Sequence, residues 1–324
     1  MKKVKQSMYA PLAVAGFAMI VSYGCAMGAF DNGDPQSGSD LGVQADAGTQ
    51  DDGAIETDGG GAADAGSVAD GGTVDDAGTP VLDRFSFFVT SLAALRDLSK
   101  SQNGFGGDLR YGETGAGAGL RGADKICAEI AERSMPGSSV KQWRAFLSVA
   151  ADGNGKQVNA IDRIGDGPWY DRLGRLLAPD KASVLNQRPI GGDSTIKNDF
   201  PNEDGVPNHR PDPTQPEVDN HDMLTGTNAE GKLYSSTATC KDWTAKAGTS
   251  DEGRPRVGHS WPRSGGPGPG AGGMDDMANW MSALDESGCK PGVNLVETGA
   301  PDPRAKTVGS GGGYGGFYCF ALIP

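Results

Sequence analysis

The sequence has little basic charge, and this shortage excludes one class of partner. Its 29 Lys and Arg face 42 Asp and Glu, which gives a formal net charge of −13 at pH 7. Binding to nucleic acid needs Lys and Arg gathered on one face, and the sequence contains no such cluster. The glycine-rich runs 264–273 and 309–316 lack the lysine and the following helix of a phosphate-binding loop. We therefore expect no nucleic-acid partner and no phosphate-binding loop.

Histidine is equally scarce, with only His209, His221 and His259 in the chain. His209 and His221 are too far apart in sequence to form a metal-binding pair on one helix, so we do not expect zinc. His259 is followed by Ser260, but the chain has no Gly-x-Ser-x-Gly elbow, and the sequence places no acid to orient the histidine. We interpret His259 as a polar loop residue and expect no catalytic site.

The apolar segment near the N-terminus is too short to span a membrane. It runs from Leu12 to Val21, follows three lysines and ends in small residues before Cys25. A basic start, a short apolar core and small residues at the end are typical of a secretory signal. Residues 1–25 are therefore predicted to be a signal peptide.

Cys25 stands about a hundred residues before any other cysteine, and two fates are open to it. The small residue before Cys25 allows bacterial lipoprotein processing, in which Cys25 is lipidated and becomes the mature N-terminus, although Ser22 departs from the usual pattern. Cleavage after Gly28 would instead discard it. The other cysteines form an even set that can pair internally, which favours lipidation of the odd one: Cys127, Cys240, Cys289 and Cys319. We expect an exported lipoprotein at the outer membrane or cell surface, with a secreted or periplasmic protein as the alternative.

Residues 26–80 are predicted to be a disordered linker. The stretch 31–80 is almost wholly Asp, Gly, Ala, Ser and Thr, with 12 acidic residues and no Lys or Arg. It has too little apolar surface to offset the entropy lost on ordering. The remaining residues, 81–324, carry 26 basic and 30 acidic groups and are long enough for one sizeable core. The linker would act as a tether for this domain.

The domain has the pattern of an α+β fold with long irregular loops. Short apolar runs predict strands over 85–90, 143–149 and 317–322. A period of three to four residues predicts a helix over 123–134, and a similar stripe of Met, Trp and Leu predicts a second helix over 274–286.

Several segments in a fixed order carry a resemblance to a known family. Leu120–Cys127, followed by Trp143–Ser148, is similar to the endostatin domain of collagen XVIII, a variant of the C-type-lectin-like fold. Later marks agree in order: Leu224–Gly231, Thr239–Trp243, Cys289 and Tyr318–Phe320. The resemblance covers about residues 85–323 and implies a C-type-lectin-like, endostatin-like fold.

The resemblance also implies the nested disulfides Cys127–Cys319 and Cys240–Cys289. Four cysteines allow three connectivities, and their spacing alone does not choose among them. Endostatin binds zinc through histidines near its N-terminus and heparin through arginines. Here 84–101 has no histidine and the domain is net acidic, so we transfer neither activity.

A carboxylate-rich loop offers hard oxygen ligands of the kind that calcium prefers. The candidate calcium ligands are Asp199, Glu203, Asp204, Glu217, Asp219 and Asp222. The alternative, which we favour, is that this loop is simply solvated. Calcium is the one cofactor that the sequence suggests.

Aromatic residues supply the remaining candidates. Trp169 and Tyr170 follow a Gly-Pro turn flanked by carboxylates, where they could stack on a sugar or anchor a partner protein. The alternative, which we favour, is an aromatic turn that caps the core. We assign Trp143, Trp243 and Trp280 to the core.

These observations predict a membrane-tethered, non-catalytic binding module for a carbohydrate or an extracellular protein. One alternative is an enzyme on a lectin-like scaffold, related to the formylglycine-generating enzymes, which would need a free thiol. The other is a purely structural component of the cell surface.

Overall fold

The computed structural model describes residues 84–208, 220–262, 279–295 and 300–323. They all belong to one of the two units of the chain, Ser67–Pro324. The predicted signal peptide, Cys25 and the predicted linker lie outside the described residues. No helix in the described ranges is long and apolar enough to cross a membrane.

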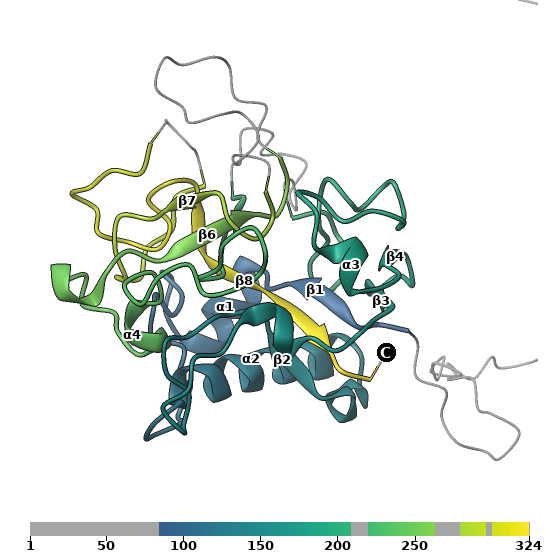
Figure 1. Ribbon diagram of the computed structural model, residues 1–324, viewed down its shortest axis with the longest axis horizontal. Helices are drawn as coiled ribbons and strands as arrows, with labels where there is room; N and C mark the ends of the chain where they lie inside the picture. Colours follow the sequence, from purple (N-terminus) through teal and green to yellow (C-terminus); the bar gives the residue numbers. More distant parts are fainter. Residues whose placement is uncertain (1–83, 209–219, 263–278, 296–299, 324) are drawn as a thin grey trace, which may run out of the picture. The chain divides into compact units, whose positions relative to one another are not determined.

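The last strand of the chain is the centre of a six-stranded sheet (Figure 1). Its strands are β1 (Phe87–Val89), β2 (Trp143–Ala145), β5 (Asp222–Leu224), β6 (Arg256–His259), β7 (Leu284–Asp285) and β8 (Gly313–Ala321). The C-terminal half of β8 lies between β1 and β2 and is antiparallel to both. Its N-terminal half pairs in parallel with β5, and β6 and β7 continue the sheet as antiparallel neighbours. All nine residues of β8 are buried, as its apolar composition favours.

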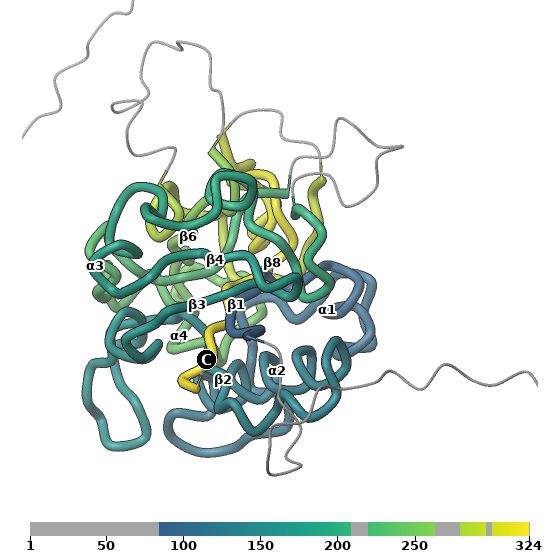
Figure 2. Tube along the Cα trace, turned by 90° about the vertical axis from the view of Figure 1, so that its right-hand side faces the viewer, coloured from purple at the N-terminus to yellow at the C-terminus, as the bar shows by residue number. Residues whose placement is uncertain are grey.

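Helices flank the part of the sheet formed by β2 and β8. The α-helical elements are α1 (Leu92–Ser99), α2 (Ala118–Ser134), α3 (Lys181–Val184) and α4 (Cys240–Trp243), and the 3₁₀ turns are η1 (Ser138–Lys141), η2 (Ala160–Arg163) and η3 (Ser250–Glu252). A two-stranded hairpin joins β3 (Trp169–Tyr170) to β4 (Leu176–Ala178). Figures 1 and 2 both show α2 on one side of β8 and β6 on the other. Much of the remaining described chain is irregular, so the fold is mixed α and β with long loops.

The three predicted strands and the first predicted helix are confirmed. β1 and β2 are shorter than their predicted runs, whereas β8 begins four residues earlier, at Gly313. Helix α2 begins at Ala118, five residues before the predicted start, because its first turns bury small residues instead of an apolar stripe. Gly119 and Gly122 pack there against backbone carbonyls that a Cβ atom would approach to 2.1 Å. The sequence pattern does not register such a face.

The second predicted helix is wrong over its described part, residues 279–286. These residues contain β7, and Ala283 N–H donates to the carbonyl of Val257 in β6 at 2.7 Å. Trp280 and Met281 are fully buried, as the apolar stripe suggested. Their burial comes from packing at a sheet edge, where a helical period has no meaning. The rest of the predicted helix lies outside the described residues.

The core contains a cluster of aromatic rings on one face of β8, because Tyr318 and Phe320 are two residues apart in the strand. Tyr318 and Phe320 contact the rings of Phe87, Phe146 and Trp280, with ring centroids 4.9 to 6.5 Å apart. Edge and tilted arrangements dominate, as expected for ring quadrupoles. The assignment of Trp143, Trp243 and Trp280 to the core is confirmed, because each is at most 1% exposed.

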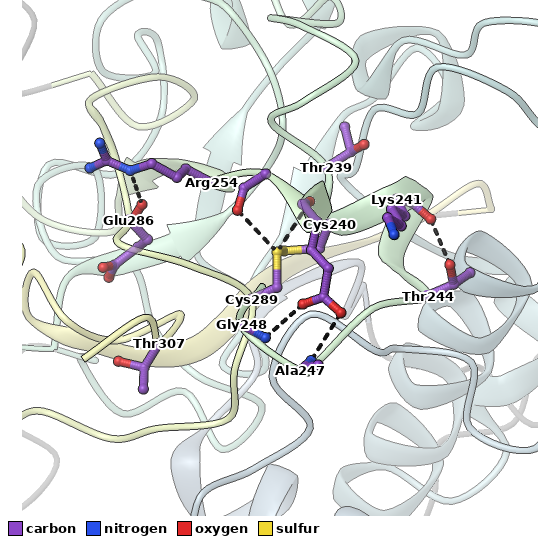
Figure 3. Close-up of a disulfide and its surroundings, with 12 residues drawn as sticks. Thr239, Cys240, Lys241, Thr244, Ala247, Gly248, Arg254, Glu286, Cys289 and Thr307 are labelled. Carbon is purple, nitrogen blue, oxygen red and sulfur yellow. Dashed lines mark hydrogen bonds between the residues drawn. A yellow bond between two sulfur atoms is a disulfide. The ribbon is translucent and has the colours of Figure 1, made fainter. Parts of the chain in front are cut away.

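Both cysteine pairs that the resemblance implied are disulfides in this structure. Cys127 of α2 joins Cys319 of β8, and Cys240 joins Cys289, each with a Cα–Cα distance of 5.6 Å. Figure 3 shows the second bridge, where the Cys289 sulfur lies 3.5 Å from the carbonyl oxygen of Glu252. The Glu252 carboxylate accepts hydrogen bonds from two backbone N–H groups of the adjacent loop. The bridges tie the helix to the last strand and the loop region to itself.

Element α4 is a left-handed turn. Cys240, Lys241, Asp242 and Trp243 all have φ between +48° and +62°. Such a run is costly for L-residues, so surrounding contacts must hold it. The Trp243 indole donates to the Ser148 carbonyl, and the Asp242 carboxylate accepts two backbone N–H groups. The Cys-x-x-Trp motif of the sequence therefore forms a strained turn, which is held by the Cys240–Cys289 disulfide and by the hydrogen bond of the Trp243 indole.

Candidate functional site

Two histidines and an aspartate meet in the interior, at the junction of β5 and β6. The strands are antiparallel, with Asp222 directly opposite His259, and His221 immediately precedes β5. The His259 Nε2 lies 3.1 Å and the His221 Nε2 3.4 Å from Asp222 Oδ1. The two imidazole rings are 4.0 Å apart between centroids, at 79°. All three side chains are fully buried.

The local backbone makes room for this cluster. The pairing of β5 with β8 shifts register between Asp222 and Met223, and such irregularities re-aim side chains. A Cβ atom at Gly311 would lie 2.7 Å from Asp222 Oδ2, and one at Gly313 would lie 2.9 Å from the Asp222 Cβ. The glycine-rich run 309–316 thus serves close packing around a buried carboxylate.

A shell of hydrogen bonds fixes the backbone that carries the histidines. The Arg188 guanidinium donates to the carbonyls of His259 at 2.6 Å and Ser260 at 2.8 Å. The same group stacks on the Phe200 ring at 4.2 Å. The Ser260 N–H donates to the His221 carbonyl at 2.8 Å. The strand ends that present the imidazoles are therefore held in place from both sides.

Glu286, the residue after β7, is a further acid of this region. Its carboxylate accepts hydrogen bonds from Ser310 Oγ at 2.5 Å and from the Gly311 N–H. Burial, then the charge of the neighbouring Asp222, raises the pKa of Glu286 well above its usual range. The carboxyl groups of Glu286 and Asp222 are therefore close enough for their charges to interact.

This geometry corrects two expectations from the sequence. His259 is a buried residue of β6 and not a loop residue, and Asp222 supplies the acid that the sequence did not place beside it. The sequence argument against zinc considered the spacing of His209 and His221. In the structure, the two histidines that lie close together are His221 and His259. The only sequence signal was that His221-Asp222 and His259 each adjoin a short apolar run.

Of the six candidate calcium ligands, the four within the described residues do not gather into one site. Glu203 is buried and accepts hydrogen bonds from Ser91 N–H and Oγ at the start of α1. Asp204 is exposed, Asp199 is half-buried, and Asp222 belongs to the histidine cluster. Glu217 and Asp219 lie outside the described residues, as does His209. Within the described ranges, the cluster of His221, Asp222 and His259 is the one group of three or more such ligands.

Trp169 is a core residue, which favours the second of the two interpretations for the aromatic turn. Its indole is 1% exposed, packs edge-on against Phe320 and donates to the Ile164 carbonyl. Tyr170 is half-buried, with the Arg84 guanidinium 5.3 Å from its ring centre. Trp169 thus offers no open ring face for a ligand.

A groove of about 490 Å³ lies elsewhere, between the 99–114 segment and the loops that the second disulfide ties. Among its lining residues are Phe105, Asp108, Arg110, Tyr111, Lys246 and Pro291. The 99–114 segment is attached to these loops by two backbone hydrogen bonds, from the Gly107 N–H to the Cys289 carbonyl and from the Leu109 N–H to the Trp243 carbonyl. The strained turn α4 and the disulfide thus position the groove.

The groove combines fixed charges with partly exposed aromatic rings. Arg110 donates to both oxygens of Asp108, at 2.8 and 2.7 Å, and the Lys246 ammonium lies 3.7 Å from the same carboxylate. Burial raises the pKa of Asp108, but the hydrogen bonds and charge of Arg110 outweigh it, so the net pKa is below its ordinary value. Phe105 and Tyr111 meet edge to face at 5.7 Å. None of these residues was singled out from the sequence, because no local pattern links them.

No family model matches the chain, and no curated protein matches it either.

Proposed function

We propose that this protein is a tethered extracytoplasmic binding module of C-type-lectin-like, endostatin-like fold, and that it holds a carbohydrate in the groove beside Tyr111. The observation that carries the proposal is the groove itself, a concave surface with a few convergent polar groups and aromatic rings. The lectin-like assignment depends on the ordered sequence marks and agrees with the mixed fold and its two disulfides.

The chemistry of the groove suits a sugar. A saccharide presents hydroxyl groups that both donate and accept, and C–H faces that pack on aromatic rings. Asp108 offers acceptor oxygens and Lys246 donors, and Phe105 and Tyr111 are half-buried, so part of each ring reaches the surface. The mild net charge of residues 81–324 suits a neutral ligand better than a polyanion.

The disulfides support an exported location. All four cysteines of the described residues are paired, and such bridges persist in oxidising compartments. In this proposal the lipid on Cys25 and the acidic linker hold the domain outside the cytoplasm. An enzyme of the formylglycine-generating type is not favoured, because it would need a free thiol. All four cysteines of the described residues are used in the two disulfides.

The test is a glycan array followed by calorimetric titration of the best ligand, with and without calcium. We expect Arg110→Ala and Lys246→Ala each to weaken binding about tenfold or more, because each removes a charged hydrogen-bonding group. Lys181→Ala is the matched control, since Lys181 is a partly exposed lysine that pairs with Asp166, and neither residue lines the groove. If the groove variants bind as tightly as the control, or if the array shows no glycan ligand, the proposal is wrong.

A further inference from the structure

The distances within the His221, Asp222 and His259 cluster fit a tetrahedral metal site. Zinc binds nitrogen at about 2.0–2.1 Å and carboxylate oxygen at about 2.0–2.2 Å, so two ligand atoms of a tetrahedral site lie about 3.4 Å apart. The two Nε2–Oδ1 distances are 3.1 and 3.4 Å. One ligand atom from each of the three residues lies within 4.8 Å of the others. A metal ion would therefore need only small side-chain movements to contact all three.

The donor set selects the class of metal. Imidazole nitrogen suits zinc and other first-row transition ions, and two histidines with one carboxylate leave a fourth position open. Calcium needs six to eight oxygen ligands, which this cluster does not provide. A cation would also compensate the charge of a carboxylate that is fully withdrawn from water.

The surroundings supply the support that metal ligands usually have. Asp222 and His259 lie on paired strands, and Gly311 and Gly313 leave the carboxylate the space it needs. The carboxylate of Glu286 is held by Ser310 Oγ and the Gly311 N–H, and Gly311 packs against Asp222, so this segment would limit the movement of that ligand. The site is thus assembled by four segments that are remote in sequence.

From this arrangement we propose that His221, Asp222 and His259 bind one divalent transition-metal ion of the zinc type in the interior of the domain. The proposal is independent of the carbohydrate groove, because the two sites share no residue. A metal bound here would link β5 to β6.

The first experiment uses the full wild-type chain. After dialysis against a chelator, the protein is loaded with Zn²⁺, and bound metal is measured by elemental analysis. We expect one zinc per chain, a higher melting temperature with zinc, and no rise with calcium, because a ligand that binds only the folded state stabilises it. Loading with Co²⁺ should give the strong visible absorption of a four-coordinate ion. Absence of stoichiometric zinc together with absence of this absorption would overturn the proposal.

The second experiment separates a ligand from a structural acid. Asp222→Asn and His259→Gln should each lower zinc affinity at least tenfold. Asp171→Asn is the matched control, because Asp171 is also a fully buried carboxylate but pairs with Arg175 in another part of the fold. The control should be destabilised and still bind one zinc. Equal zinc affinity in Asp222→Asn and the control would contradict the assignment.

Discussion

At position 241, glycine should be more stabilising than alanine, although the residue lies in a segment with a helical hydrogen-bond pattern. In an ordinary helix, glycine is about 1 kcal/mol less favourable than alanine. Lys241 has φ +54° and ψ +54°, however, and belongs to a turn of four residues with positive φ. Only glycine adopts that region without a steric penalty.

The magnitude follows from two opposing terms. A left-handed conformation costs an L-residue about 1–2 kcal/mol, and glycine loses about 0.5–1 kcal/mol of extra backbone entropy on folding. Both variants lose the exposed ion pair of Lys241 with Asp251, so Lys241→Ala is the proper reference. The difference between the two terms is about 0–1.5 kcal/mol, and we expect Lys241→Gly to be more stable than Lys241→Ala by about the middle of this range.

Urea unfolding of matched pairs measures this difference. Lys125 is an exposed lysine in the regular helix α2, so Lys125→Gly should be less stable than Lys125→Ala by about 1 kcal/mol. In a domain of this size, 1 kcal/mol moves the melting temperature by about 2–4 °C. The opposite signs at the two sites are the signature of the left-handed turn. If glycine is less stable than alanine at both positions, the assigned backbone of α4 is wrong.

Three further predictions concern the packing of the domain. Removing the Cys127–Cys319 disulfide with the double variant Cys127→Ala and Cys319→Ala should lower the free energy of unfolding in urea by about 5 kcal/mol. The reason is that this disulfide closes a long loop, with a sequence separation of 192. Unchanged stability would contradict the disulfide. Gly119→Ala should lower the free energy of unfolding by about 2 kcal/mol, although alanine has the better helix propensity. The reason is that the new Cβ atom would lie 2.1 Å from the Asp242 carbonyl oxygen. A neutral or stabilising result would refute this close approach. Burial raises the pKa of Glu203 above its ordinary value of 4.5. Above pH 4.5 the folded state therefore binds more protons at this group than the unfolded chain does. As the pH rises above 4.5, the contribution of Glu203 to the free energy of unfolding should fall. Glu203→Gln should flatten this part of the pH profile in thermal unfolding, and an unchanged slope would contradict the assignment.

Local patterns predicted three strands and one helix of the described structure, namely β1, β2, β8 and α2. The apolar runs that became β1, β2 and β8 bury every second or every residue, a property that neighbouring residues alone encode. The same kind of pattern failed over 279–286, where a stripe with a helical period lies at the edge of a sheet. The period indicates which residues are buried. It does not indicate which partner buries them.

The functional candidates show the same division. The acidic loop suggested calcium, yet its acids are distributed between the α1 terminus, the surface and the histidine cluster. The residues of the groove form no recognisable motif: most come from the segment 99–114, and Lys246 and Pro291 join them only when the second disulfide and α4 bring their loops together. The histidine cluster joins residues from distant segments, so no spacing along the chain predicts it.

The sequence by itself determined the short-range features of this protein: the strands that form the core of the sheet, the face of α2 that packs on it, and the mildly acidic charge of the domain. Tertiary structure alone decided that His221 and Asp222 meet His259, that α4 is left-handed, and where the groove lies. The physical reason is that secondary structure depends on the pattern of neighbours along the chain. The meeting of distant side chains depends instead on strand register and close glycine contacts that the whole fold sets together.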